Sequence, residues 1–343
     1  MTAPATVNRA RLIQSRAVLS FGLLIGLGIL ILLVGLSVIL GAADISFVTI
    51  WDSLFAYNDT LFHHLVIRTA RLPRVISGLI VGASLAVAGG MMQGITRNPL
   101  ASPDILGVNS GAAFAVVLVV YTVGNASLSV YAVASIIGAS ISAVMVYALG
   151  SMGRSGTTPL KLTLAGVIFT SFMGSFTTMI LIRDERTLEQ IRFWTVGSLA
   201  GREWSLFVQT APYMVIGLIG ALLLARQITT ISLGEDIATG LGQNTIIIKG
   251  LSAVVMVLLA GGAVALAGPI GFVGLVAPHL ARFLVGQDYR WVLPYSAIIG
   301  GALVVVGDIG ARMVIRPQEL PVGIMLAVFG APFFIYLARW KVK

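Results

Sequence analysis

Long apolar runs return along the whole sequence and constrain its fold more than any other feature. Cutting the chain at charges, prolines and turn residues leaves ten runs, most of about 17–25 residues, the length of a bilayer-spanning helix. The runs lack the alternation of membrane barrel strands, so only helices suit them. We therefore expect an all-α, polytopic membrane protein with ten transmembrane helices. The expected spans are 17–41, 72–94, 104–121, 129–150, 160–182, 205–225, 246–267, 269–285, 291–312 and 321–340.

Composition supports a single membrane domain over residues 1–343. Apolar residues make up 57% of the chain and charged residues 10%, whereas soluble domains average about 45–50% and about 25%. There is no Cys, which excludes disulfides, Cys-ligated zinc and thiolate catalysis, and the three His leave little for a metal centre. We therefore expect no cofactor and no catalytic residue.

The first apolar run is expected to stay in the protein as a spanning helix. It follows Arg9, Arg11 and Arg16 and is 25 residues long, whereas the apolar core of a secretory signal has about 7–15 residues. Residues 1–16 are then a basic tail on the cytoplasmic side.

The distribution of charge predicts the orientation. If the N-terminus is cytoplasmic, the inner segments hold 13 Lys and Arg against four acids, and the outer segments hold nine of each. This arrangement obeys the positive-inside rule, and ten spans return the C-terminus to the cytoplasm. The net charge of +9 therefore lies at the inner membrane surface, and no nucleic-acid partner is expected.

Two connecting segments carry recognisable patterns. In the outer segment 183–204, Leu188, Ile191, Phe193 and Trp194 suggest a short amphipathic helix at the membrane interface, or an ordinary connector. The inner loop 225–245 contains LGEDIATGLGQN. There Ala238, Leu241 and Gly242 are spaced to share a small apolar helix face, and Glu235 and Asp236 lie where a helix dipole favours acids.

The chain shows no energy source of its own. It has no G-x-x-x-x-G-K-[ST] loop to hold ATP phosphates. No charged residue lies near the centre of an expected span, where ion-coupled carriers usually place acids. Asp308 and Arg312 stand one helical turn apart toward the outer end of the ninth expected span and can pair with each other. A transport pathway of this kind needs an engine on another subunit.

Four long segments resemble the permease subunits of binding-protein-dependent ABC importers for ferric siderophores, haem and cobalamin, the FecCD-like or type II importer family. They occur in the family's order and cover nearly the whole chain. They are RLPRVISGLIVGASLAVAGGMMQGITRNPLASPDILGVNSGA (71–112), GEDIATGLG (234–242), GPIGFVGLVAPHLARFLVG (268–286) and GDIGARMVIRPQELPVGIMLAVFGAPFFI (307–335).

The resemblance implies a transporter with several partners in a bacterial cell membrane. It implies a second permease subunit, identical or homologous, two cytoplasmic ABC ATPase subunits and an extracytoplasmic substrate-binding protein. The coupling segment falls on 232–244, with Gly234, Glu235, Ala238, Leu241 and Gly242 as contact residues. The arginines that receive the binding protein fall on Arg71, Arg74 and Arg312.

The sequence leaves the substrate and the pathway open. Met91, Met92 and Gln93 end the second expected span and are candidates for lining the pathway, although Met91 and Met92 also suit ordinary packing. A ferric siderophore is the expected substrate, with haem or cobalamin as the alternative within the family. Outside the family, an ion-coupled secondary carrier would need acids in the middle of its spans, and an intramembrane enzyme would need paired catalytic groups there.

Overall fold

The structure, a computed structural model, describes residues 15–41, 45–124, 126–152, 159–192, 194–316 and 318–341. Most of the predicted tail 1–16 lies outside these residues. Throughout the described ranges the regular elements are helices. The long ones are α1 (Arg16–Ile39), α4 (Leu72–Thr96), α5 (Val108–Val123), α6 (Leu128–Ser151), α7 (Pro159–Arg183), α9 (Trp204–Leu233), α11 (Thr245–Ala267), α12 (Val273–Val285), α13 (Tyr289–Met313) and α14 (Val322–Lys341).

Short helices connect the long ones at both ends of the bundle. They are α2 (Phe47–Phe55), α3 (Phe62–Val66), α8 (Glu185–Ile191) and α10 (Glu235–Gly240). The helix predicted in the outer segment is α8, where Ile191 is buried and Leu188 is exposed; Phe193 lies outside the described residues. A π-helical turn, Ile67–Arg71, joins α3 to α4.

The ten long helices confirm the all-α class and correspond one to one with the ten expected spans. Seven helices in the described part of the chain are long and apolar enough to cross a membrane on their own. The three shorter apolar helices are α5, α12 and the apolar part of α14, residues 322–332. Helices α5 and α12 are short because the chain immediately before each of them is not regular α-helix.

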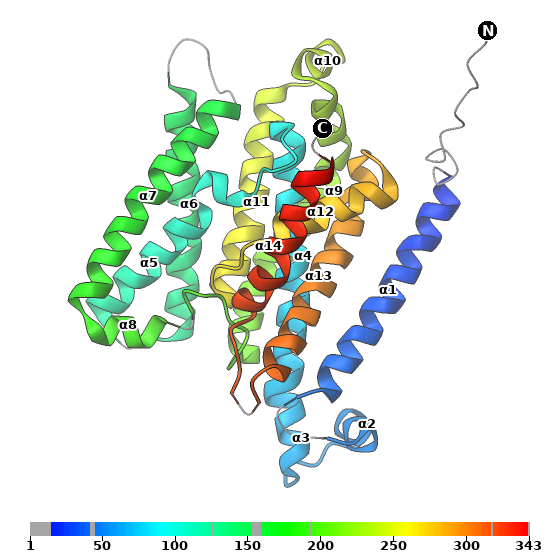
Figure 1. Cartoon of the computed structure of the whole chain (residues 1–343), viewed down its shortest axis with the longest axis vertical. Coiled ribbons are helices and arrows are strands. Elements are labelled where there is room, and N and C mark those ends of the chain that lie inside the picture. Colours follow the sequence, from blue (N-terminus) through cyan, green and yellow to red (C-terminus); the bar gives the residue numbers. More distant parts are fainter. Residues whose placement is uncertain are drawn as a thin grey trace.

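Helix α4 lies at the centre of the bundle and α1 at its edge (Figure 1). In the most apolar stretch of each span, 89% of the residues are buried for 62–96 but only 11% for α1. Helices α9, α11, α12 and α13 pack around α4, while α5, α6 and α7 form a second group on the opposite side of the bundle from α1.

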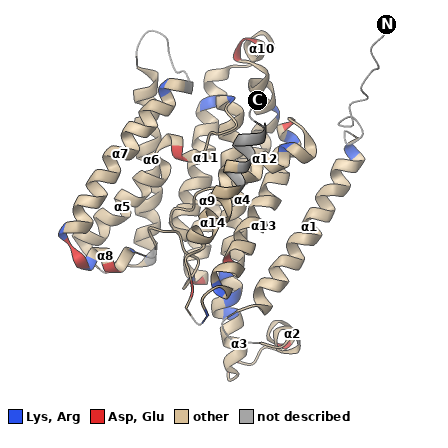
Figure 2. Ribbon diagram, viewed as in Figure 1, with Lys and Arg blue, Asp and Glu red and all other residues tan. Residues whose placement is uncertain are grey.

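Charged residues gather at the two ends of the bundle (Figure 2). One end, here called the α10 end, carries α10 and the first turn of α1. The other, the α8 end, carries α2, α3 and α8. Thus α10 and the start of α1, both predicted to be cytoplasmic, share one end, and α2, α3 and α8, predicted to be outer, share the other.

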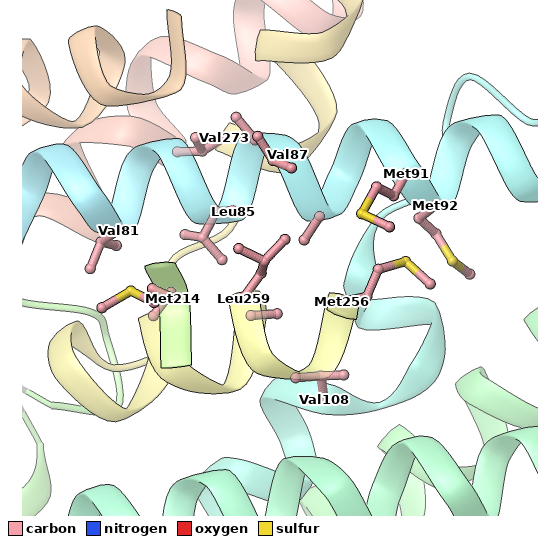
Figure 3. Close-up of a cluster of buried hydrophobic side chains, with 14 of the residues drawn as sticks. Val81, Leu85, Val87, Met91, Met92, Val108, Met214, Met256, Leu259 and Val273 are labelled. Atoms are coloured by element: carbon pink, nitrogen blue, oxygen red, sulfur yellow. The ribbon is translucent and has the colours of Figure 1, made fainter. Parts of the chain in front are cut away.

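Small residues let α4 approach its neighbours closely. A Cβ added to Gly89 would collide with the carbonyl oxygen of Gly274 in α12, and one added to Gly82 would meet the backbone of Gly300 in α13. Larger side chains fill the space between these contacts. Figure 3 shows Val81, Leu85 and Met91 of α4 beside Leu259 and Met256 of α11.

We expect Gly89→Val to destabilise the subunit strongly. The added side chain must push α12 away from α4, and overpacking of this kind costs about 1–3 kcal/mol or more. Thermal melting of the detergent-purified subunit should show a midpoint several degrees lower. Gly28→Val is the matched control, because no atom of the described residues lies within 4 Å of a Cβ at Gly28 of α1. Equal midpoints for the two variants would contradict the packing argument.

The third expected span begins later than predicted because the chain first turns back into the bundle. Helix α5 starts at Val108 instead of residue 104. Before it, Ser102 and Asp104 line a small cavity together with Leu85, which lies halfway along α4. Asp104, one of the four acids assigned to the inner segments, therefore lies beside the middle of α4 and not past its end.

The break between α11 and α12 is also longer than predicted. Helix α12 begins at Val273, whereas the expected span began at 269. Gly268 has a φ of 75° and Phe272 a φ of 77°, and left-handed backbone at a bulky residue such as Phe is a true outlier. The chain between α11 and α12, residues 268–272, is thus an irregular break in place of the single residue left between the two expected spans.

Candidate functional site

The predicted coupling segment forms a short helix held firmly at the α10 end. Helix α9 continues to Leu233, eight residues beyond the expected span end at 225, so the connection to α11 is shorter than predicted. Gly234, with a φ of 139°, turns the chain sharply into α10. The side chain of Ala238 is fully buried. Gln243 donates from Nε2 to the carbonyl oxygen of Gln227 in α9 at 3.2 Å.

An ion pair fixes the other side of α10. Lys249 of α11 donates from Nζ to Oε2 of Glu235 at 2.7 Å, and Thr245 donates to Oε1 at 3.2 Å. The hydrogen bond from Lys249 holds the pKa of Glu235 below its ordinary value. Glu235 therefore carries its charge at neutral pH, and the pair orients α10 across the ends of two spanning helices.

The exposed apolar face of α10 differs from the predicted one. Ala238, Leu241 and Gly242 were expected to share it, but Ala238 points into the protein. Ile237 and Leu241, four residues apart, are 51% and 71% exposed and form the outward face. Gly242 follows at a φ of 80°, with open space around it. The orientation of α10 has a simple cause. A small residue such as Ala238 allows close packing on α9, whereas the larger side chains of Ile237 and Leu241 remain outside.

At the α8 end, Asp308 of α13 joins two of the three predicted docking arginines. Arg74 donates from Nη2 to Asp308 Oδ1 at 2.9 Å, and Arg312 lies with its Nε 3.1 Å from Asp308 Oδ2. Arg74 also donates from Nη1 to Glu319 at 2.6 Å. The predicted pairing of Asp308 with Arg312 is thus present, and Arg74 adds a second cation to it.

Arg71 and Arg312 also close the last turn of α1. Arg71 donates from Nη1 to the carbonyl oxygens of Val38 and Ile39 at 2.6 and 3.0 Å. Arg312 donates to those of Ser37 and Leu40 at 3.0 and 2.7 Å. The last carbonyls of a helix lack partners within it and form its negative end, so cations suit them. Two arginines therefore hold the poorly buried α1 against the bundle.

A cavity of about 780 Å³ opens beside these residues at the α8 end. We call it the arginine cavity, since Arg71, Arg74, Arg312 and Arg202 all line it. Glu203 and Glu319 line it as well, and Phe62 and Trp204 contribute aromatic surface. The structure thus brings the three predicted docking arginines to one place and adds a fourth, Arg202.

The three predicted pathway residues lie in the packed core. Met91, Met92 and Gln93 are all at most 3% exposed, and Gln93 donates from Nε2 to the carbonyl oxygen of Gly274 at 3.2 Å. Lining a pathway would require α4 to separate from α12, so the packing gives this prediction no support. Among the described residues, no three His, Cys, Asp or Glu side chains gather where they could share a metal ion.

Two residues of these sites, Ile237 and Arg202, were not predicted from the sequence. Ile237 had a usable signal, because the spacing of Ile237 and Leu241 also places them on one helix face. Arg202 had none, since it looked like any charge in an outer connecting segment.

Known proteins match the chain over almost its whole length. The sequence profile of the FecCD transport family matches residues 29–340. The iron(3+)-hydroxamate import system permease protein FhuB of Bacillus subtilis is 45% identical over 92% of this chain and 82% of its own. The ferric enterobactin transport system permease protein FepD of Escherichia coli is 37% identical over 96% and 97%. The hemin transport system permease protein HmuU of Yersinia pestis is 36% identical over 95% and 96%.

A solved structure has the same fold. It is an inward-facing conformation of a metal-chelate type ABC transporter, with a TM-score of 0.81 and 28% sequence identity. The match covers 95% of this chain and all of the other.

Proposed function

Because the chain belongs to the FecCD transport family, we propose that it is the membrane permease subunit of a binding-protein-dependent ABC importer for a ferric siderophore. Two such subunits, identical or homologous, form the translocation pathway, and ATP hydrolysis on two cytoplasmic subunits drives it. The names of the relatives support an iron chelate, since they concern hydroxamate, enterobactin and hemin import. The hemin relative keeps haem as the alternative substrate.

The observation that carries the proposal is the outward apolar face of α10. Ile237 and Leu241 project from a helix that Glu235 and Gln243 anchor to two spanning helices. Exposed Ile and Leu beside polar groups suit a partner protein, and a rigid anchor would transmit the partner's movement to the bundle. We infer that the ATPase subunits bind this face, with residues 232–244 as the coupling segment.

Orientation follows from the same proposal. The α10 end faces the cytoplasm with both chain termini, as the excess of Lys and Arg favours. The α8 end faces outward, and its arginines create a positive potential for the substrate-binding protein. Charge complementarity of this kind steers encounter and fixes register.

Reconstitution tests the proposal. The permease should be purified with its ATPase subunits, placed in lipid vesicles and given a substrate-binding protein loaded with a ferric siderophore or with haem. We expect uptake of labelled iron to require ATP on the side of the membrane that carries the ATPase subunits. Proton or sodium gradients should not change it. Uptake that follows an ion gradient without ATP would establish the carrier alternative, and uptake of haem alone would replace the siderophore.

A further inference from the structure

Arg202 differs from the other arginines of the arginine cavity in having no carboxylate partner among the described residues. It lies in the connection between α8 and α9, two residues before Trp204 begins α9. Its side chain makes one hydrogen bond within the described ranges, from Nε to the carbonyl oxygen of Ser198 at 3.2 Å. Arg74 and Arg312, by contrast, share Asp308, and Arg71 and Arg312 bind the end of α1.

Burial makes this unpaired charge costly. Arg202 is only 9% exposed, and a buried charge is normally paired with an opposite one. Desolvation lowers the pKa of Arg202 to about 10, with no carboxylate in the described part of the chain to oppose it. The guanidinium still carries its charge at neutral pH, since that value lies well above 7. Arg202 lines the arginine cavity.

We propose that Arg202 is the binding point for a carboxylate side chain of the extracytoplasmic substrate-binding protein, inserted into the arginine cavity. The inference rests on the proposed function, which supplies such a partner. A planar guanidinium whose terminal nitrogens are not used within the described residues can hold a carboxylate through two parallel hydrogen bonds. Arg71, Arg74 and Arg312 already bind carboxylates or carbonyl oxygens within the subunit, so we assign them the supply of positive potential around the point of contact.

Charge on the cavity wall favours this occupant over a lipid phosphate. Glu203 and Glu319 line the same cavity, and their carboxylates accept hydrogen bonds that a lipid phosphate cannot donate. A protein partner can avoid them, because it places one carboxylate at a fixed position and donors elsewhere.

The test compares Arg202→Gln with wild type in the reconstituted permease and ATPase complex. We expect the affinity of the substrate-binding protein to fall about 30-fold, since losing one member of a desolvated charge pair typically has at least this effect. Basal ATP hydrolysis should stay unchanged, and Arg202→Lys should retain part of the affinity. Arg186→Gln on α8 is the matched control, because Arg186 is an exposed arginine at the same end of the bundle.

A scan of the binding protein identifies the partner group. Each Asp and Glu is changed to Gln and tested against wild-type and Arg202→Gln permease. One carboxylate should show a large loss with wild type and little further loss with the variant, the sign of direct coupling. If Arg202→Gln does not assemble, the scan is run with Arg202→Lys instead, and one carboxylate should show a smaller loss with that variant than with wild type.

Three results would overturn the inference. One is wild-type affinity for the binding protein in Arg202→Gln at normal abundance. That result would mean that water, not a carboxylate, hydrogen-bonds the Arg202 guanidinium. Another is a scan in which no carboxylate couples to position 202. The third is a loss seen in phosphatidylglycerol vesicles but not in phosphatidylcholine vesicles, which would assign Arg202 to a lipid phosphate. Failure of the binding protein to stimulate the wild-type complex at all would instead reject the proposed function.

Discussion

Replacing Ile237 and Leu241 together with aspartate is expected to stop ATP-driven uptake while the subunit stays folded in the membrane. Both side chains are largely exposed in the subunit, at 51% and 71%, so their loss removes no internal packing. In a complex they would be buried, and burying an Ile or Leu side chain is worth about 1.5–3 kcal/mol. Two such losses weaken binding of the ATPase at least about 100-fold, and the new carboxylates add a desolvation cost.

The measurement is co-purification of the ATPase subunits with the permease, followed by uptake in vesicles. Thr239→Asp is the matched control. It adds one carboxylate to α10 where the double variant adds two, but position 239 is about 200° around the helix from Ile237, at about 100° per residue. Its hydroxyl bonds the helix's own Glu235 carbonyl oxygen. We expect this control to retain uptake. Normal uptake by the Ile237 and Leu241 double variant at normal abundance would remove α10 from the coupling mechanism.

The α10 face shows which features of this site could be predicted from the sequence. Its position, its helical form and the exposure of Leu241 followed from the sequence and the family resemblance. The burial of Ala238 did not, because it depends on α9 continuing to Leu233 and presenting a packing surface. The sequence ARQITTISL, which ends α9, contains one charged residue and three residues with hydroxyl groups. Because these residues are polar, the apolar pattern predicted a loop there.

The spans themselves were predictable for a physical reason. A bilayer fixes both the length and the apolar character of each helix, so ten runs gave ten helices. The prediction failed where the chain enters the bundle without being a full span. Asp104 stands in such a place, beside Leu85 of α4, and local sequence cannot distinguish a turn at the surface from one at mid-depth.

The arginine contacts at the α8 end were beyond local sequence as well. Only the pairing of Asp308 with Arg312, one helical turn apart, could be read from spacing. Arg312 reaches Ser37, which is 275 positions away in the chain, and Arg74 reaches Asp308 over 234 positions. Contacts between residues this far apart in the chain depend on how α1, α4 and α13 pack together. The family resemblance implied a shared fold but not these individual contacts.

Asp308→Ala is expected to destabilise the α8 end strongly. Among single changes to Arg71, Arg74, Arg312, Asp308 and Glu319, here called the arginine cluster, we expect it to have the largest effect. Asp308 is 4% exposed and receives bonds from both Arg74 and Arg312. Its removal leaves two guanidinium groups close together without the shared anion, and breaking a buried pair in this way costs about 3–5 kcal/mol. Because Arg312 also holds the end of α1, we expect the loss to loosen that helix.

Thermal melting and the accessibility of a cysteine introduced at Ser37 would measure this effect, since the chain has no other cysteine. Ser37 is 2% exposed, so its labelling reports release of α1. Glu319→Gln is the matched control: Glu319 is 30% exposed and, among the described residues, bonds Arg74 alone, so we expect a loss of about 1 kcal/mol or less. Adding Arg74→Met to Asp308→Ala should recover stability, because it removes one of the two uncompensated charges. A melting midpoint for Asp308→Ala equal to that of Glu319→Gln would show that the cluster is held together by its backbone contacts instead.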